Sequence, residues 1–266
     1  PGGVNDQRPD RAVIVYANLI RRYFKPTRPI VLGGIEASLR RIAHYDFWSD
    51  RVRRSILLDA KADYLLYGMA HASVLELAKA LKQTRTTEDV KGLAWISKTP
   101  KGVEMPSFEA VRDGRDEFIR AFRMFYGNND PATAQTLCQR HNDRFLVINP
   151  PGPRSEASDL DLIHGLPFER NLHPLHHPRG TVRALDTIRF AIPTHYGCYG
   201  ECRFCAISVH QGRTVQSRSP ASILREAEII SRLDGFKGYI HDLGGPTANM
   251  YGYECRRKLS HGACKD

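Results

Sequence analysis

Hydrophobic and polar positions in the first 85 residues follow two alternating periods. Apolar residues three and four positions apart predict helices, the first of which ends before Pro26. Short apolar runs that lead into glycine predict buried strands between the helices. The predicted helices cover residues 13–24, 36–42 and 74–81, and the predicted strands cover 29–34 and 62–68. Strands that alternate with helices favour a parallel sheet, so this region predicts an α/β fold.

The pattern in the middle of the chain is weaker. It predicts strands at 93–97 and 145–149 and helices at 108–126 and 131–140. Residues 152–180 are rich in Pro and His and show little periodicity. We therefore expect a domain boundary or a crossing segment there.

A βαβ pattern begins near residue 187. Residues 188–192 alternate like a strand and lead into a segment with three cysteines. Ser219 and Pro220 predict a helix start, because serine caps helices and proline suits the first helical position. A strand at 238–243 follows and runs into Gly244-Gly245. This order predicts one right-handed βαβ unit.

The composition is that of a folded protein. The chain has 266 residues, of which 41% are hydrophobic and 26% are charged, so it holds one large domain or two small ones. Its formal net charge of +10 is compatible with an anionic partner. No apolar run is long enough to span a membrane, and no signal peptide is recognisable, so we expect a cytoplasmic protein.

The six cysteines are unevenly distributed, with three of them inside eight residues. Cys198, Cys202 and Cys205 have the spacing Cys-x3-Cys-x2-Cys and follow a predicted strand. Clustered thiolates in a reducing compartment select soft metals such as zinc or the iron of iron–sulfur clusters. A structural zinc site needs a fourth ligand, for which His195 and His210 are the near candidates. A four-iron cluster on three cysteines would keep one iron open.

This triplet resembles the signature of radical S-adenosylmethionine (radical SAM) enzymes. The resemblance implies that Cys198, Cys202 and Cys205 hold a [4Fe-4S] cluster whose open iron binds S-adenosylmethionine. An electron from the cluster then cleaves the sulfonium bond and releases a 5′-deoxyadenosyl radical, which abstracts hydrogen from the substrate.

The resemblance also assigns roles to three residues outside the triplet. It implies that Phe204, just before the third cysteine, packs near the adenine. It further implies that Gly244 and Gly245 lie near the methionine amino group. Pro246 stands where the family usually has a glutamate. Read without the resemblance, Phe204 is an ordinary loop residue and the glycine pair a tight turn.

Further motifs resemble the YgiQ-like radical SAM family and together cover nearly the whole chain. They are Val31-Leu-Gly-Gly-Ile-Glu-Ala-Ser38, His44-Tyr-Asp46, Asn149-Pro-Pro151, Leu166-Pro-Phe-Glu-Arg170, His173-Pro174, His210-Gln-Gly-Arg213 and Ser217-Arg-Ser219. This resemblance implies an N-terminal region similar to cobalamin-binding domains, followed by the radical SAM barrel. The family's substrate is not established.

On this basis we expect three regions. Residues 1–150 form an N-terminal parallel-sheet α/β domain, residues 151–182 connect, and residues 183–266 begin a radical SAM (β/α) partial barrel. Barrel active sites lie at the carboxyl ends of the strands, where the triplet and the glycine pair fall. A full eight-strand barrel takes about 250 residues, so we expect the chain to be a fragment with exposed strand edges.

Two glycines and three cysteines outside the triplet have competing interpretations. The chain lacks the Asp-x-His-x-x-Gly motif that coordinates the cobalt of cobalamin. Gly33-Gly34 could bind a phosphate at the start of a helix, but it fits a simple strand-to-helix turn better. Cys138 is expected to be a buried thiol. Cys255 and Cys264 are either unrelated thiols or the start of an auxiliary cluster site.

Histidines and arginines also allow more than one role. His173, His176 and His177 fit loop histidines better than metal ligands. His195 and His210 could donate a hydrogen bond to a cluster sulfur or to substrate. Arg213 and Arg218 could reach an anionic group such as the carboxylate of S-adenosylmethionine, or serve the surface. The residues Arg40, Arg41, Arg51, Arg53 and Arg54 could contact RNA or form ion pairs with Asp46, Asp50 and Asp59.

The favoured function is a radical SAM enzyme of unknown substrate, supplied by an electron donor such as flavodoxin or ferredoxin. The alternative is a zinc-stabilised RNA-associated binding protein, which would use the same cysteines structurally and the arginines for phosphate.

Overall fold

The computed structural model describes residues 9–245 and 249–262, which divide into two compact units. The larger unit contains residues 11–154, 199–213 and 255–262. The smaller unit contains residues 155–198, 214–245 and 249–254, with residues 9 and 10. Pro246 and Cys264 lie outside the described residues, so the expectations for them are untested.

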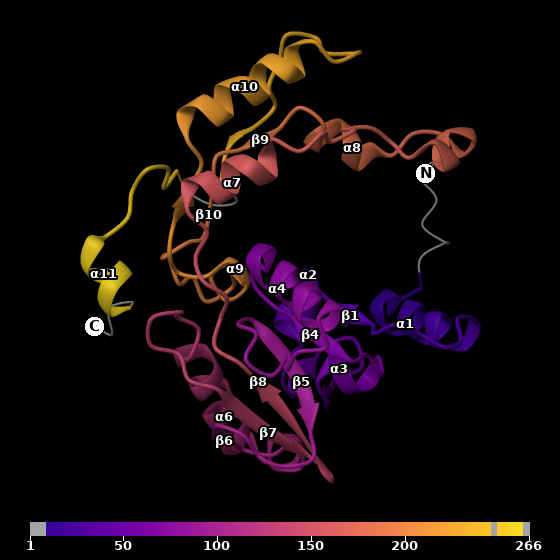
Figure 1. Cartoon of the computed structure of the whole chain (residues 1–266), viewed down its shortest axis with the longest axis vertical. Helices are drawn as coiled ribbons and strands as arrows, with labels where there is room; N and C mark the ends of the chain where they lie inside the picture. Colours follow the sequence, from indigo (N-terminus) through magenta and orange to yellow (C-terminus); the bar gives the residue numbers. More distant parts are fainter. Residues whose placement is uncertain (1–8, 246–248, 263–266) are drawn as a thin grey trace. The chain divides into compact units, whose positions relative to one another are not determined.

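A six-stranded mixed sheet forms the centre of the larger unit (Figure 1). Its order is β1 (Val31–Leu32), β4 (Tyr64–Leu66), β5 (Leu93–Ser97), β8 (Arg144–Ile148), β7 (Leu137–His141) and β6 (Val103–Met105). The α/β class is confirmed, and the β1–β4 pair is parallel as expected. The β6–β7 pair at the other edge is also parallel, although neither of its strands was predicted. The inner pairs are antiparallel.

One of the antiparallel pairs, β7–β8, is explained by its short loop. Only Asn142 and Asp143 join the two strands, and a two-residue loop permits only an antiparallel pairing. Asn142 has φ 55°, a left-handed conformation that asparagine tolerates in tight hairpin turns.

The predicted helix at 131–140 is therefore wrong, because β7 occupies most of it. Gln139 is fully buried, where its side chain accepts from the Ala43 amide and donates to the Pro106 carbonyl. His141 is also buried on this strand. Because these buried positions of β7 are polar, the sequence lacks the apolar–polar alternation that is typical of a strand. Cys138, on the same strand, is the buried thiol that was expected.

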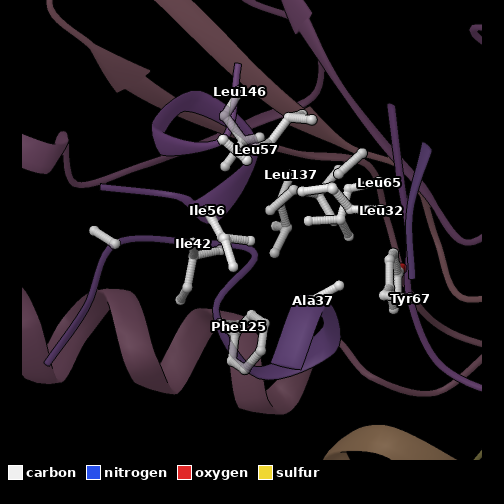
Figure 2. Close-up of a cluster of buried hydrophobic side chains, with 14 of the residues drawn as sticks. Leu32, Ala37, Ile42, Ile56, Leu57, Leu65, Tyr67, Phe125, Leu137 and Leu146 are labelled. Atoms are coloured by element: carbon white, nitrogen blue, oxygen red, sulfur yellow. The ribbon is translucent and has the colours of Figure 1, made fainter. Parts of the chain in front are cut away.

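The described part of this unit also contains helices, most of which contribute side chains to its core. They are α1 (Ala12–Tyr23), α2 (Gly34–Leu39), α3 (Ile56–Asp59), α4 (His71–Lys82), α5 (Phe108–Asp113), α6 (Arg115–Gly127), α9 (Ile207–Gln211) and α11 (Arg256–His261). A small hairpin of β2 (His44–Asp46) and β3 (Arg51–Arg53) lies between α2 and α3 in sequence. Figure 2 shows side chains from α2, α3, α6, β1 and β4 meeting in one apolar cluster that includes Ala37, Ile56, Phe125, Leu32 and Leu65.

Most helices of this unit were predicted, but one predicted helix is divided in two. The helix predicted at 108–126 is divided into α5 and α6 because Gly114 adopts an extended backbone between them. Ser107 caps α5 by accepting from the Ala110 amide.

The smaller unit contains the expected βαβ element. It comprises α7 (Ala157–His164), the 3-10 helix η1 (Pro174–Arg179), α8 (Arg183–Ile188), β9 (Ile192–Pro193), β10 (His195–Tyr196), β11 (Gln216–Ser217), α10 (Pro220–Ser231) and β12 (Leu243–Gly244). β9 and β12 pair in parallel with α10 between them in sequence, and Ser219 caps α10 as predicted. The two predicted strands are shifted and shorter. Of residues 188–192 only Ile192 belongs to β9, because α8 continues through Ile188, and of residues 238–243 only Leu243 belongs to β12.

A buried ionic network fixes α10 within the smaller unit. Glu226 accepts from both Arg170 and Arg218. Arg218 is completely buried and also donates to the Pro193 carbonyl and the Ser222 side chain. None of the helices in the described ranges is both long and apolar enough to cross a membrane.

Candidate cluster-binding site

The cysteine loop starts at a glycine that has no room for a side chain. Gly197 follows β10 and has φ 85°, which favours glycine. A Cβ at this position would overlap the carbonyl of Thr214. The backbone therefore turns tightly into Cys198, which is buried in the smaller unit.

The other two cysteines belong to the larger unit. The Cys205 amide donates to the Cys202 carbonyl at 2.9 Å, which closes a turn between them. Both are unbridged thiols; Cys202 is exposed and Cys205 is half-buried. Thiols that are accessible and close in the chain are suitable ligands for a soft metal.

Cys202 and Cys205 line a cavity of about 550 Å³ in the larger unit. Phe122, Phe125 and Tyr126 on α6 form its apolar wall. The other apolar residues that line it are Leu39, Ala206 and Val209. The aromatic residues are three and four positions apart, so they share one face of α6. The thiols thus face an aromatic wall.

Charged residues stand at the same cavity. Glu201 and Arg203 line it, and Glu201 forms an ion pair with Arg213 at 2.8 Å. The Arg213 guanidinium also lies 4.3 Å from the centre of the Tyr126 ring. Arg213 therefore connects the cysteine loop to α6, and its suggested role toward an anion stays a prediction.

Phe204 is on this cavity, and 93% of its surface is exposed. An aromatic ring with that exposure contributes little to the packing of the loop. It is available to a ligand, so its expected contact with adenine stays a prediction.

The glycine pair has a structural role in the smaller unit. Gly244 belongs to β12, and its carbonyl accepts from the Thr194 amide at 2.8 Å. A Cβ on Gly245 would overlap the imidazole ring of the buried His195. This contact requires glycine at 245, whereas the expected role of the pair toward methionine stays a prediction.

The remaining candidates are placed as follows. Arg218 is enclosed in the network with Glu226. Arg40 pairs with Asp46, and Arg53 and Arg54 both pair with Asp59, so the ion-pair interpretation is confirmed for these three. Arg41 is buried and Arg51 is exposed.

The structure also places the loop histidine His173 and the cysteine Cys255. His173 caps η1 by accepting from the Leu175 amide. Cys255 is exposed. In the described ranges, no three His, Cys, Asp or Glu side chains gather as a metal-binding group. The ligand roles of the triplet therefore stay predictions.

Sequence reasoning missed the aromatic face of α6 and two residues that contact α9, the helix after the cysteine loop. Phe122, Phe125 and Tyr126 have helical spacing, which is equally typical of a buried stripe. Ser38 and Asn129 contact α9 across separations of 172 and 79 residues. No local signal marks such contacts.

Comparison with known proteins places the chain in a class. The Radical SAM N-terminal family matches residues 1–191, which is more than half of the chain. The chain belongs to this family, which confirms the YgiQ-like radical SAM resemblance.

Its relatives are proteins named UPF0313. The chain is 52% identical to UPF0313 protein FN0734 of Fusobacterium nucleatum and 45% identical to a UPF0313 protein of Thermotoga maritima, in each case over 100% of the chain and 47% of the relative. The identity to a Clostridium botulinum UPF0313 protein is 43%, over 100% of the chain and 42% of that protein. The chain thus spans about half the length of the curated relatives it matches.

Among solved structures, the chain resembles the radical S-adenosylmethionine methyltransferase TsrM from Kitasatospora setae with cobalamin and [4Fe-4S] cluster bound. The identity is 18% and the TM-score 0.41, over 83% of this chain and 31% of that chain. A TM-score this low does not establish a shared fold.

Proposed function

We propose that the chain carries the cluster site of a radical SAM enzyme, in which Cys198, Cys202 and Cys205 hold a [4Fe-4S] cluster. The observation that carries this proposal is the cavity where Cys202 and Cys205 face the aromatic side of α6. Membership in the Radical SAM N-terminal family supports it.

The donor set fits a cluster with one open iron. All three donors are soft thiols, of which Cys202 is exposed and Cys205 half-buried. Gly197 precedes the first cysteine, and Gly200 lies between the first two. A bound cluster would supply the electron that cleaves S-adenosylmethionine and starts radical chemistry.

The chain's own residues would orient the ligands and exclude water. The Gly197 turn directs Cys198 inward, and the Cys202–Cys205 turn brings two thiols to the cavity. Phe122 and Phe125 give an apolar surface that keeps water from a reactive group. Phe204 would stack on the adenine, and the backbone of Gly244 and Gly245 would lie near the methionine amino group.

The whole enzyme would act on a substrate of unknown class and take electrons from a small carrier such as flavodoxin or ferredoxin. Oxygen-sensitive clusters persist in a reducing compartment, so we place this activity in the cytoplasm.

Anaerobic reconstitution of the full chain with iron and sulfide tests the proposal. We expect a brown protein with about four irons per chain that forms 5′-deoxyadenosine from S-adenosylmethionine under reductant. The variant with Cys198→Ala, Cys202→Ala and Cys205→Ala should bind no cluster. The matched control Cys255→Ala, at another exposed cysteine, should behave as wild type.

Two results would contradict the proposal. One is a colourless protein that retains a tightly bound zinc ion, which would favour the zinc-stabilised binding protein. The other is an unchanged iron content in the triple variant.

A further inference from the structure

The carboxyl ends of β1 and β4 are where an α/β sheet is expected to receive a ligand. β1 leads into the Gly33-Gly34 turn and α2, and β4 leads into Tyr67 and Gly68. Open α/β sheets bind ligands outside the carboxyl ends of their strands. In this chain the edge is in contact with α9, the helix that begins two residues after Cys205.

Two contacts place α9 on that edge. A Cβ on Gly68 would lie 3.4 Å from the His210 carbonyl, so the backbones of the β4 loop and α9 approach closely. The His210 Nδ1 is 2.9 Å from the Ser38 hydroxyl. Ser38 is on α2 and completely buried.

The other hydrogen bonds of Ser38 determine which group donates in its contact with His210. Its hydroxyl donates to the Gly34 carbonyl at 3.1 Å and accepts from the Gly68 amide at 3.0 Å. Because the hydroxyl has a single hydrogen, Nδ1 of His210 is the donor to Ser38. Burial lowers the pKa of His210, and the charge of Arg41 lowers it further, so the ring is neutral at pH 7.

Asn129 makes a second connection to α9. Its side-chain amide donates to the Ser208 carbonyl at 3.1 Å and to the Val209 carbonyl at 3.4 Å. Its oxygen accepts from Arg41 at 3.4 Å. A five-residue helix has no internal partners for its last carbonyls, so Asn129 supplies a donor that α9 lacks.

Arg41 holds Asn129 in place from inside the core. Its guanidinium lies 4.1 Å from the ring centre of Tyr67 and 4.2 Å from that of Phe125. Burial lowers the pKa of Arg41 to about 10, which still leaves it protonated at pH 7. Stacking between two aromatic rings compensates part of the cost of burying this charge.

We propose that the carboxyl edge of β1 and β4 is a docking site for α9 of the same chain, with Ser38 and Asn129 as positioning residues for Cys205. The docked helix occupies the carboxyl ends of these strands, the side on which open α/β sheets bind ligands. The effect on a cluster rests on the proposed function, whereas the docking itself does not.

The docking can be measured in the cluster-free full chain. We would follow alkylation of Cys205 by iodoacetamide with peptide mass spectrometry and use exposed Cys255 as the internal reference. Ser38→Ala and Asn129→Ala should each raise the Cys205 rate about fivefold, the factor by which loss of a buried hydrogen bond shifts a local opening equilibrium. Cys255 should react at an unchanged rate.

Matched variants separate docking from general loss of stability. His210→Phe should raise the Cys205 rate, whereas His210→Asn should restore it, because the asparagine amide can donate from the position of Nδ1. Ser49→Ala removes a serine that bonds Asp46 in the β2–β3 segment and should leave the Cys205 rate unchanged. Equal Cys205 rates in wild type and all these variants would overturn the docking.

A second measurement connects docking to the cluster. In reconstituted protein, Ser38→Ala and Asn129→Ala should lose iron to a chelator several-fold faster and shift the electron paramagnetic resonance signal of the reduced cluster. If wild type assembles no cluster while Ser38→Ala still accelerates Cys205, the docking holds and the proposed function fails. If wild type assembles a cluster and the variants match it in both measurements, the docking fails and the proposed function holds.

Discussion

The imidazole ring of His195 occupies the space that a side chain on Gly245 would need. His195 is completely buried, and its Nδ1 lies 2.9 Å from the hydroxyl of Thr194. The ring therefore cannot move away easily to admit a new group. The turn after β12 is thereby tied to the strand that precedes the cysteine loop.

The substitution Gly245→Ala should destabilise the protein because its methyl group would overlap that ring. Overpacking of this kind costs about 1–3 kcal/mol. Gly244→Ala is the matched control, since its Cβ would meet only Asp242 at 3.6 Å, an ordinary contact. Urea unfolding should show a lower midpoint for Gly245→Ala alone. A control variant that loses as much stability would count against the contact with His195.

Glu226→Gln should destabilise the smaller unit strongly. The change leaves Arg218 and Arg170 without their carboxylate, and removing one partner of a buried ion pair costs about 3–5 kcal/mol. Glu228→Gln changes an exposed glutamate on the same helix and should stay within about 0.5 kcal/mol of wild type. Chemical denaturation measures both, and similar values for the two variants would refute the network's role.

His141 should make stability fall as the pH is lowered from about 6.5 to 4. Burial lowers the pKa of His141 to about 4. As the pH falls, the unfolded chain therefore binds a proton at this residue before the folded protein does, and the free energy of unfolding decreases. The loss reaches about 3 kcal/mol at pH 4. His141 stacks on Phe108 at 5.5 Å, so His141→Phe keeps an aromatic ring there and removes the titration.

The measurement for His141 is the free energy of unfolding at a series of pH values. The slope between pH 6.5 and 4 should be smaller in His141→Phe than in wild type. Parallel curves for the two proteins would show that His141 does not titrate in this range.

Local signals in the sequence predicted the helices and strands whose formation depends on a few neighbouring residues. Ser219 and Pro220 mark the start of α10, and the apolar run of residues 93–97 marks β5. The pairing of β9 with β12 followed from the order of elements alone. In each case the information lies within a few residues or in a general rule of chain connection.

The parts that sequence reasoning missed depend on distant partners. The inward-facing Gln139 is satisfied by Ala43 and Pro106, so a polar residue became part of a buried strand. Ser38 and Asn129 acquire their role only when α9 reaches them. For the candidate site, the spacing of the cysteines indicated the chemistry, but nothing near them in sequence indicated the aromatic face of α6.

Residues 199–213 lie beyond the connecting segment in sequence, yet they are part of the same compact unit as residues 11–154. A chimera that exchanges this family's N-terminal region between relatives should therefore also exchange the segment from Tyr199 to Arg213. An exchange that stops at residue 154 would pair α9 from one parent with Ser38 and Asn129 from another. The compact unit that such a chimera would transfer is discontinuous, and α9 is joined to Ser38 and Asn129 by hydrogen bonds instead of by the adjacent backbone.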